Sequence, residues 1–434
     1  MNVFRSMDRF FFAPVSATGF GLMRVTWGAA VFLSFALQWP DVTRYYSAAG
    51  QLPPWLSENM TGPLPSASLL WWLPHPDGVF LAYLLLLAFS ACACIGLRPR
   101  ATVIATTVLL ISFHVRNPWH TTGGDVILRS VGFILSIGPG GLHAFSIARA
   151  REQMHHWMRS GKLLTRLTMP AWPQRLLLWE LIIIYVQSLW SKLLGTMWWN
   201  GTAVGVALHH THFGRFALSP VADRLSEIGA LLGWSVMVWE ACWLLLLVPK
   251  GMIPSGVSGQ LRRWLLLTSF LIHTAFSVLL RLGSFLTAMP AILLGNLQAD
   301  DVDVMRKMVN RKWHGNISMF YDGQCGFCSR STCALILMDW LRRLRPVNFR
   351  SAQEHRTWAP DLLMKDLDRT VHVRFPDGKI FTGFCAFRAL ATHLPPLWPV
   401  APLLYLPGMK FVGDRIYKRI AARRKQCTHG DCLR

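Results

Sequence analysis

The sequence predicts a helical membrane part followed by a small α/β domain, and three observations carry that prediction. Of the 434 residues, 52% are hydrophobic and only 15% are charged, whereas a soluble protein carries about a quarter charged residues. Apolar runs of membrane-spanning length recur as far as residue 299. The sequence after that point is ordinarily charged, with 23 basic and 12 acidic residues. We therefore expect two domains, at 1–299 and 300–434.

Eight apolar runs are candidate transmembrane helices, because a helix needs about 20 mostly apolar residues to cross a bilayer. They cover residues 17–37, 78–97, 101–115, 124–138, 176–195, 227–248, 264–280 and 283–298. The third, fourth and eighth are short, which suits partial spans or tilted packing. With a cytoplasmic N-terminus, 13 basic residues fall in cytoplasmic segments and 5 in the opposite loops. The positive-inside rule therefore predicts that both termini lie in the cytoplasm and that the lipid bilayer surrounds the first domain.

The basic stretch at 149–175 allows two interpretations. His155, His156 and Trp157 suit an amphipathic helix at the membrane surface, where basic side chains meet anionic lipid headgroups. The alternative is a solvated basic loop that only sets the topology.

The second domain alternates short strands and helices. Residues 317–322 form an apolar strand, and 327–342 follow as an amphipathic helix. Residues 371–381 have the pattern of a hairpin, with Asp377-Gly378 as its turn signal. A further helix is expected at 383–394. This order, with a Cys-x-x-Cys turn between the first strand and the first helix, is typical of a small thioredoxin-like domain.

The turn carries the pair Cys325 and Cys328, preceded by Asp322. At the start of a helix the first sulfur faces unpaired N–H groups and the positive end of the helix, which favours the thiolate. We therefore expect Cys325 to be the nucleophile and Cys328 to resolve the mixed disulfide, so that the two form a redox-active disulfide. Asp322 is either a proton relay or a residue that caps the turn. Cys333 and Cys385 are most simply core thiols.

The string around this pair resembles the DCC-type thiol-disulfide oxidoreductase family, whose mark is Asp-Gly-x-Cys-x-x-Cys after a strand. The resemblance runs from about residue 317 to the end. It also includes Gly378, Gly383, Ala386-Phe387-Arg388, Leu406-Pro407-Gly408 and a closing cysteine pair. It implies redox activity in a thioredoxin-like fold, with a protein or a small thiol as partner. No proline stands directly before the strand at 371, so the cis-proline substrate clamp of thioredoxins is not evident.

The closing pair leaves a second chemistry open. Cys325, Cys328, Cys427 and Cys432 could form a four-thiolate zinc site, with His429 nearby. Alternatively, Cys427 and Cys432 are a second dithiol that relays electrons. The strand-turn-helix context of the first pair favours redox chemistry over zinc.

Lys192 lies near the outward end of the fifth predicted span, in the segment 185–201. A charge inside a span is costly and usually functional. The simpler interpretation is a lysine that lifts its ammonium group to the interface, beside the aromatic residues Trp198 and Trp199. The span alone does not decide between the two.

Two further strings accompany the Lys192 segment: Arg116-Asn-Pro-Trp-His-Thr-Thr-Gly-Gly-Asp125, and Leu282-Gly-Ser-Phe285 together with His273. The three segments resemble the HTTM family, the multi-span domain of vitamin K-dependent gamma-carboxylases and their bacterial relatives. This resemblance covers about residues 15–298. It implies a bacterial inner-membrane protein that handles a quinone or hydroquinone.

The same resemblance implies particular roles. Lys192 would be the base that acts on the hydroquinone, and a base lysine must be neutral. The implied cofactor-binding residues are Asn117, Asp125, Trp198, Trp199 and His273. Leu189 and Glu180 depart from the family pattern. Nothing in the sequence supplies the large lumenal domain that binds Glu-rich substrates, so the expectation is limited to quinone chemistry.

Two functions from different classes follow. The first is an enzyme: a membrane-bound thiol-disulfide oxidoreductase that couples quinone chemistry to the Cys-x-x-Cys pair. The second is a lipid- or peptide-binding or transport protein with a redox- or zinc-regulated cytoplasmic module. Nucleic acid is not an expected partner, because the basic residues form no aromatic-basic stripe and face an anionic membrane surface.

Overall fold

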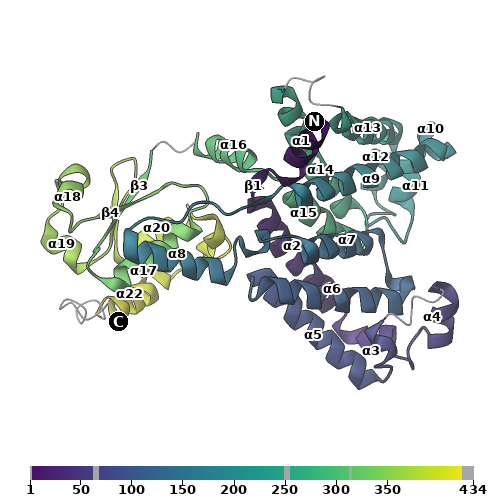
Figure 1. The fold of residues 1–434 in the computed structure, drawn as a ribbon, viewed down its shortest axis with the longest axis horizontal. Helices are drawn as coiled ribbons and strands as arrows, with labels where there is room; N and C mark the ends of the chain where they lie inside the picture. The colour runs from purple at the N-terminus through teal and green to yellow at the C-terminus, as the bar shows by residue number, and fades with distance from the viewer. Residues whose placement is uncertain (1, 62–67, 249–254, 312–314, 423–434) are drawn as a thin grey trace. The chain divides into compact units, whose positions relative to one another are not determined.

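The computed structural model describes residues 2–61, 68–248, 255–311 and 315–422. The chain folds into two compact units (Figure 1). The first comprises residues 1–149 and 166–301, and the second comprises residues 150–165 and those from 302 onward. The segment 150–165, which we expected in the membrane domain, therefore belongs to the second unit.

The first unit is built from helices. Its longer helices are α1 (Asn2–Phe12), α2 (Thr18–Ala36), α5 (Pro76–Ile95), α6 (Pro99–Arg116), α7 (Gly123–Ile137), α9 (Trp172–Leu194), α13 (Gly229–Cys242), α14 (Ser255–Leu279) and α15 (Phe285–Gly295). Its shorter helices are α3 (Val42–Tyr46), α4 (Pro54–Thr61), α10 (Thr196–Trp199), α11 (Ala203–His209) and α12 (Pro220–Glu227). Strands β1 (Pro14–Ser16) and β2 (Thr168–Pro170) pair antiparallel. The chain passes from the first unit to the second within α8 (Ile147–Ser160) and again within α16 (Ala299–Asn310).

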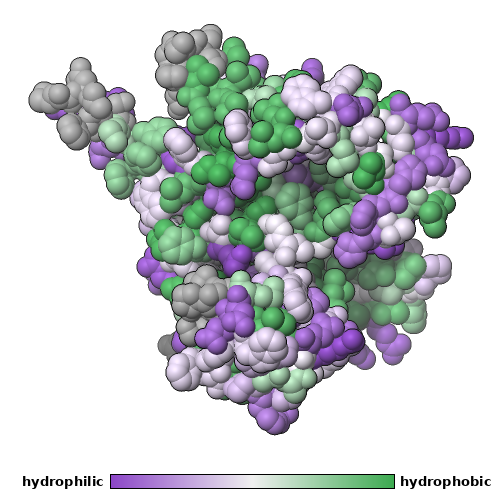
Figure 2. Space-filling model, turned by 90° about the vertical axis from the view of Figure 1, so that its right-hand side faces the viewer, coloured by the Kyte–Doolittle hydropathy of each residue, from purple (hydrophilic) through white to green (hydrophobic). Residues whose placement is uncertain are grey.

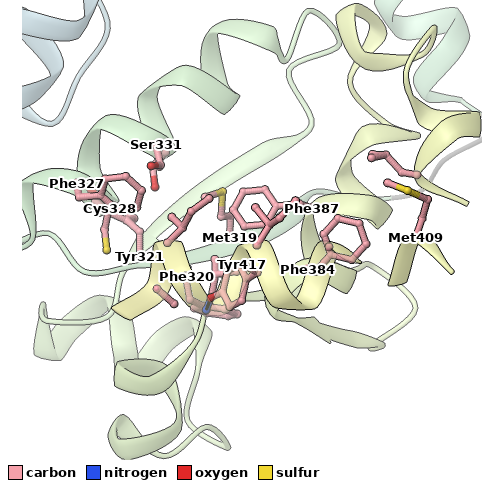
Figure 3. A pocket seen from close by; sticks show the side chains of 17 residues that line it. Met319, Phe320, Tyr321, Phe327, Cys328, Ser331, Phe384, Phe387, Met409 and Tyr417 are labelled. Atoms are coloured by element: carbon pink, nitrogen blue, oxygen red, sulfur yellow. Dashed lines mark hydrogen bonds between the residues drawn. The ribbon is translucent and has the colours of Figure 1, made fainter. Parts of the chain in front are cut away.

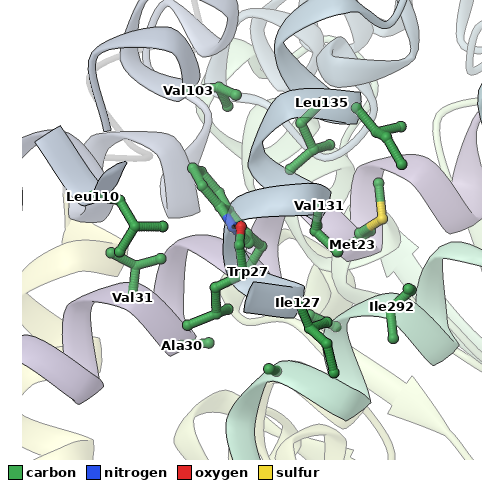
Figure 4. Packing of buried hydrophobic residues seen from close by; sticks show 14 of the residues in the cluster. Met23, Trp27, Ala30, Val31, Val103, Leu110, Ile127, Val131, Leu135 and Ile292 are labelled. Atoms are coloured by element: carbon green, nitrogen blue, oxygen red, sulfur yellow. Dashed lines mark hydrogen bonds between the residues drawn. The ribbon is translucent and has the colours of Figure 1, made fainter. Parts of the chain in front are cut away.

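Helix α2 forms the centre of the first unit. Trp27 is fully buried among side chains of α6 and α7 (Figure 4), and its indole N–H donates to the carbonyl of Leu128 at 2.8 Å. Gly28 allows α5 to approach closely, because a Cβ there would lie 2.7 Å from the backbone nitrogen of Cys94. The buried guanidinium of Arg24 donates to four backbone carbonyls of other segments. These contacts satisfy a charge that would otherwise be costly in the core.

Four segments of the described chain are long and apolar enough to cross a membrane: 18–36, 76–95, 172–194 and 229–247. Each coincides with one of the eight predicted runs. The other four runs are helical too, in α6, α7, α14 and α15. However, α7 and α15 have only 15 and 11 residues, too few to cross about 30 Å at 1.5 Å per residue.

The candidate spans differ in their surroundings. More than half of α2 is buried inside the unit, whereas less than a quarter of α9 and of 229–247 is buried. Large apolar side chains point outward on them, including Trp190 at 63% exposure and Val238 at 66%. Figure 2 shows hydrophobic side chains spread over large areas of one face. Such a surface is unusual for a soluble monomer and is consistent with a membrane protein.

The second unit contains a four-stranded sheet in the order β4-β3-β5-β6. The strands are β3 (Ile317–Tyr321), β4 (Leu344–Asn348), β5 (His372–Arg374) and β6 (Ile380–Thr382). β3 runs parallel to β4 and antiparallel to β5, and β5 forms a hairpin with β6. The predicted hairpin at 371–381 is thus present, with Gly378 at a φ of +82° in its turn.

Helices cover both faces of this sheet. They are α17 (Gly326–Met338), α18 (Ala352–Trp358), α19 (Met364–Arg369), α20 (Gly383–Ala391), α21 (Ala401–Leu404) and α22 (Met409–Ala422). Alternate residues of β3 enter different cores: Met319 packs with Leu335 and Leu390, and Phe320 packs with Val347 and Leu367. The period of two along the strand therefore builds two apolar layers.

Helix α17 ends four residues earlier than the predicted 327–342. The carboxylate of Asp339 accepts the backbone N–H of Leu344 at 2.6 Å. Arg342 adopts a left-handed conformation with a φ of 54°. The chain reverses here because β4 must begin at Leu344 to pair with β3.

Candidate functional site

The cysteine pair lies where β3 passes into α17. Cys325 is the N-cap residue of α17, and the backbone N–H of Cys328 donates to its sulfur at 3.4 Å. Thus the first sulfur lies at the end of the helix that carries unpaired N–H groups, as predicted. Both cysteines are nearly buried, at 7% and 8% exposure. The sequence therefore places one thiol at the helix N-terminus and the second one turn later on the same helix.

Asp322 shapes the turn that leads into the pair. One carboxylate oxygen accepts the N–H of Gln324 at 2.9 Å, which closes an Asx turn. The other accepts a hydrogen bond from the guanidinium of Arg350 at 2.9 Å. Arg350 also pairs with Asp368. The hydrogen bond to Asp322 is the main reason that the pKa of Arg350 is raised, so the guanidinium stays charged.

Asn348, at the end of β4, ties the same turn to the sheet. Its side-chain carbonyl accepts the N–H groups of Gly323 and Arg350, at 3.0 and 3.1 Å. Gly323 is required here, because a Cβ would lie 2.3 Å from the Asn348 amide nitrogen. The cysteine turn is thus held by residues that come after it in the chain.

Trp157 of α8 packs against the first turns of α17. Its indole N–H donates to the hydroxyl of Ser329 at 3.1 Å, and its ring lies 6.1 Å from that of Tyr321. Only 5% of Trp157 is exposed. The sequence predicts either a helix at the membrane surface or a solvated loop for this stretch. The structure instead buries its tryptophan beside the residue that follows Cys328, so both interpretations are wrong for Trp157.

A cavity of about 420 Å³ opens beside Cys328 (Figure 3). Its walls come from β3, α17, α20 and α22, and they are mostly apolar. They include Tyr321, Phe327, Phe384, Phe387 and Tyr417. Ligand pockets of this size and character are common in proteins. Cys325 is not among the residues that line it.

The prediction of core thiols holds for one of the two remaining cysteines that the structure describes in the second unit, because Cys385 is only half-buried. Cys333 is fully buried in α17, and burial raises the pKa of its thiol to about 11. It is therefore a core thiol, as expected. Cys427 and Cys432 lie outside the described residues. Within the described ranges, no group of three or more His, Cys, Asp or Glu residues could hold a metal ion.

Comparison with known families bears on this site. Residues 319–429 match the family model of DCC1-like thiol-disulfide oxidoreductase. The match covers about a quarter of the chain and includes both cysteines of the motif. It supports a thiol-disulfide oxidoreductase role for the DCC1-like domain. No curated protein and no solved structure matches the chain.

The first unit holds a buried ion pair at Lys192. Its ammonium lies 2.8 Å from a carboxylate oxygen of Glu240 on α13. Ser188, one turn earlier on α9, contacts the ammonium and donates to the same carboxylate. The ring of Trp198 lies 5.0 Å from the ammonium, within range of a cation–π contact. Trp199 is 57% exposed, and its indole N–H donates to the carbonyl of Leu193.

The Lys192 segment and the two strings that accompany it in the sequence meet in the structure. The hydroxyl of Thr122 hydrogen-bonds to that of Ser284 at 2.9 Å. The ring of Phe285 lies 5.2 Å from that of His273, and Nε2 of His273 lies 3.0 Å from the hydroxyl of Tyr185. Residues from segments far apart in the chain therefore converge on one region of the first unit.

Asn117 and Asp125 have structural partners in this region. The Asn117 amide donates to the carbonyl of Tyr45 at 2.7 Å. Asp125 caps α7 by accepting the backbone N–H of Thr122, and it lies 3.4 Å from Nε2 of His114. These contacts account for both side chains without a ligand.

Sequence reasoning missed several residues of these sites. Arg350 hydrogen-bonds to Asp322, which lies 28 residues earlier in the sequence, and Trp157 hydrogen-bonds to Ser329, which lies 172 residues later. Neither lies in a motif that links it to the cysteine turn. Glu240 lies within the predicted span 227–248, and the sequence alone does not pair it with Lys192. The signal for its pairing was the single lysine on the neighbouring helix.

Proposed function

We propose that this chain is a membrane-bound thiol-disulfide oxidoreductase of the bacterial inner membrane, with both termini in the cytoplasm. The observation that carries the proposal is Cys325 at the N-cap of α17, with Cys328 one turn behind it. The strand order β4-β3-β5-β6, with the first pair parallel and the others antiparallel, suits a thioredoxin-like fold. Because the cytoplasm is reducing, a catalytic role is favoured for such a pair over a stable structural disulfide.

The chemistry is a two-step exchange. The Cys325 thiolate attacks one sulfur of a substrate disulfide, forms a mixed disulfide with it and releases the other substrate sulfur as a thiolate. Cys328 then attacks the sulfur of Cys325, releases the second substrate thiolate and leaves a Cys325–Cys328 disulfide. The substrate gains two electrons, and the cysteine pair loses two. Asp322 acts as a positioning residue, because its two oxygens hold the turn and the Arg350 contact.

A single-turnover assay tests this role on the full chain in detergent. The protein is reduced, the reductant is removed, and a disulfide-linked peptide pair with a fluorescence quencher is added. Wild type should release peptide thiols. Cys325→Ser should release none, and Cys328→Ser should stall with one peptide attached at position 325, visible as added mass. Cys385→Ser is the matched control and should behave as wild type. Peptide release by Cys325→Ser at the wild-type rate would refute the assignment.

A second candidate function is favoured by the polar groups inside the first unit. We infer that the helical unit binds a quinone-like molecule near Lys192 and Glu240. One carboxylate oxygen of Glu240 and one ring nitrogen of His273 are buried with no hydrogen-bond partner among the described residues. Buried polar atoms without a hydrogen-bond partner are candidates for contact with a ligand. The ammonium of Lys192 lies 2.8 Å from the carboxylate of Glu240, so a proton can pass directly between the two side chains.

Quinone binding is measured separately from thiol chemistry. The quenching of tryptophan fluorescence by a soluble benzoquinone analogue is compared in wild type, Glu240→Gln and His273→Phe. We expect weaker binding in both variants, with Trp179→Phe on an exposed face of α9 as control. Equal affinity in all four proteins would argue for the alternative, in which the helical unit binds another lipid or a peptide. Loss of quinone binding without loss of peptide reduction would show that the two activities are uncoupled.

A further inference from the structure

Helix α22 packs against the second unit with one of its sides. Gly413 allows close packing on α20, because a Cβ there would lie 2.3 Å from the ring of Phe384. The hydroxyl of Tyr417 accepts the backbone N–H of Val371 at 2.9 Å and hydrogen-bonds to Thr370 at 3.0 Å. Gly413 and Tyr417 are four residues apart, so they share one side of the helix. These contacts fix which sides of α22 remain uncovered.

An apolar stripe next to the packed side is left exposed. Val412, Ile416 and Ile420 follow one another at intervals of four, so they lie in one row along α22. Their exposed fractions are 45%, 52% and 41%. Ile416 and Ile420 also line the cavity beside Cys328, so the stripe includes part of the wall of that cavity. Apolar side chains exposed together in this way mark a surface that binds a partner or a membrane.

Basic side chains border this apolar stripe. Arg415 and Arg419, also four residues apart, form the neighbouring row of α22, and Lys410 and Lys418 belong to the same helix. All four are exposed. Asp414 is the single acidic residue of α22, so four basic residues minus one acidic residue give the helix a net charge of +3. An apolar row beside a basic one is typical of a helix that lies at the surface of an anionic membrane.

The composition of α22 favours lipid over a protein as the partner. Lysine and other charged residues are depleted at the core of protein interfaces, whereas Lys410 and Lys418 accompany the apolar row here. Lipid phosphates are complementary to the charge of +3, and acyl chains are complementary to the apolar row. A bilayer is available to this helix, because the same chain carries four segments that are long and apolar enough to cross a membrane.

We propose that the exposed side of α22 binds the surface of an anionic lipid bilayer. The apolar stripe enters the boundary between headgroups and acyl chains, and Arg415 and Arg419 bind lipid phosphates. Because the stripe includes part of the wall of the Cys328 cavity, lipid bound here lies beside that cavity. The inference rests on the membrane location in the proposed function and is independent of the thiol exchange.

Photo-crosslinking to lipid tests this contact in the full chain. A benzophenone amino acid replaces Val412, and in a control protein it replaces Met364, which is 40% exposed on α19 of the same unit. Each protein is placed in nanodiscs of phosphatidylcholine, alone or mixed with anionic phosphatidylglycerol, and is irradiated. Peptide mass spectrometry measures the lipid adduct. With the anionic lipid we expect at least about tenfold more adduct at position 412 than at 364, since each basic side chain near the surface strengthens binding about fivefold.

Each other outcome of this experiment counts against the proposal. Equal adducts at the two positions would overturn the lipid contact and leave the thiol exchange standing. Protein that stays soluble without lipid or detergent would overturn the membrane location as well. An adduct that joins two protein chains in place of lipid would show that a second copy covers the stripe. An adduct at position 412 that is the same without phosphatidylglycerol would overturn the phosphate contacts.

Charge variants separate lipid binding from a change in fold. The double variant Arg415→Gln, Arg419→Gln should lower the adduct at position 412 at least about fivefold in anionic nanodiscs. The double variant Arg356→Gln, Arg369→Gln removes the same charge from exposed sites of α18 and α19 and should leave the adduct unchanged. The buried thiol of Cys333 should stay protected from alkylation in both, which shows that the unit is folded. Equal adducts in the two double variants would overturn the role of the α22 arginines.

Discussion

Replacing Trp157 by alanine should loosen the redox unit, although in the sequence this residue lies between α7 and α9 of the helical unit. Trp157 is buried against α17 and donates to Ser329. Truncation of a buried tryptophan to alanine costs about 3–5 kcal/mol. Since about 1.4 kcal/mol corresponds to a tenfold change, the population in which the unit is open should rise by at least about 100-fold.

Cys333 reports this opening. It is fully buried, and burial raises its pKa to about 11, so an alkylating reagent at pH 8 modifies it only after the unit opens. The modification rate of Cys333, followed by peptide mass spectrometry in full-length protein, should therefore rise about 100-fold in Trp157→Ala. Trp157→Phe loses mainly one hydrogen bond of about 1 kcal/mol and should raise the rate about fivefold. Trp398→Ala, at a half-exposed site of the same unit, is the control. A wild-type rate in Trp157→Ala would refute the assignment of α8 to the redox unit.

Three further changes should have separable effects. Burial alone would raise the pKa of Asp301, but hydrogen bonds from two arginines hold it below the usual 3.8. The resulting stability is complete above pH 3.8 and is lost as the pH falls through the lower folded pKa. In Asp301→Asn the free energy of unfolding should therefore depend less on pH between about 2 and 5. The same loss of stability at low pH as in wild type would contradict this. Lys192→Met leaves the Glu240 carboxylate buried without its cation and should cost about 3–5 kcal/mol, measured as a lower Tm in detergent. A second change, Glu240→Leu, should restore most of that loss, and a further decrease would rule out the pair as its cause. Asp322→Asn keeps the Asx turn and weakens the contact with the quarter-exposed Arg350, so unfolding should cost about 1 kcal/mol less. A large change in the pH profile of peptide reduction in that variant would instead indicate a proton relay.

Much of the second unit could be predicted because its signals are local. The Cys-x-x-Cys turn, the helix after it and the Asp377-Gly378 hairpin each depend on a few adjacent residues. Strand β4 was missed for the same reason. Its sequence, Leu-Arg-Pro-Val-Asn, has no clear alternation and includes Pro346, so it resembles a loop. It is a strand because β3 offers it a parallel partner over five residue pairs.

In the helical unit, the sequence predicts where helices occur better than it predicts where they end. Apolar runs identify helices well, and all eight predicted runs are helical over most of their length. Length decides whether a helix can cross a bilayer, and that depends on where each helix ends. Gly138 and Gly295 mark the ends of α7 and α15, and Pro290 lies within α15. Composition alone did not give these ends.

The pairing of side chains could not be predicted from motifs, and Trp157 illustrates the reason. An amphipathic helix exposes one apolar face, but its sequence does not state whether lipid or protein covers that face. Here the partner is Ser329, and 172 residues separate the two. Closing so long a loop costs chain entropy, and tertiary packing must offset that cost. Contacts of this range therefore form late in folding. The redox unit is therefore complete only after the chain from α9 to α15 has been made, since that chain lies between its two parts. An isolated fragment that begins at residue 302 lacks Trp157, so it should be less stable than the same residues in the full chain. Restoring residues 150–165 as a linked segment should recover the protection of Cys333, and failure to do so would mean that α8 does not stabilise the unit through this contact.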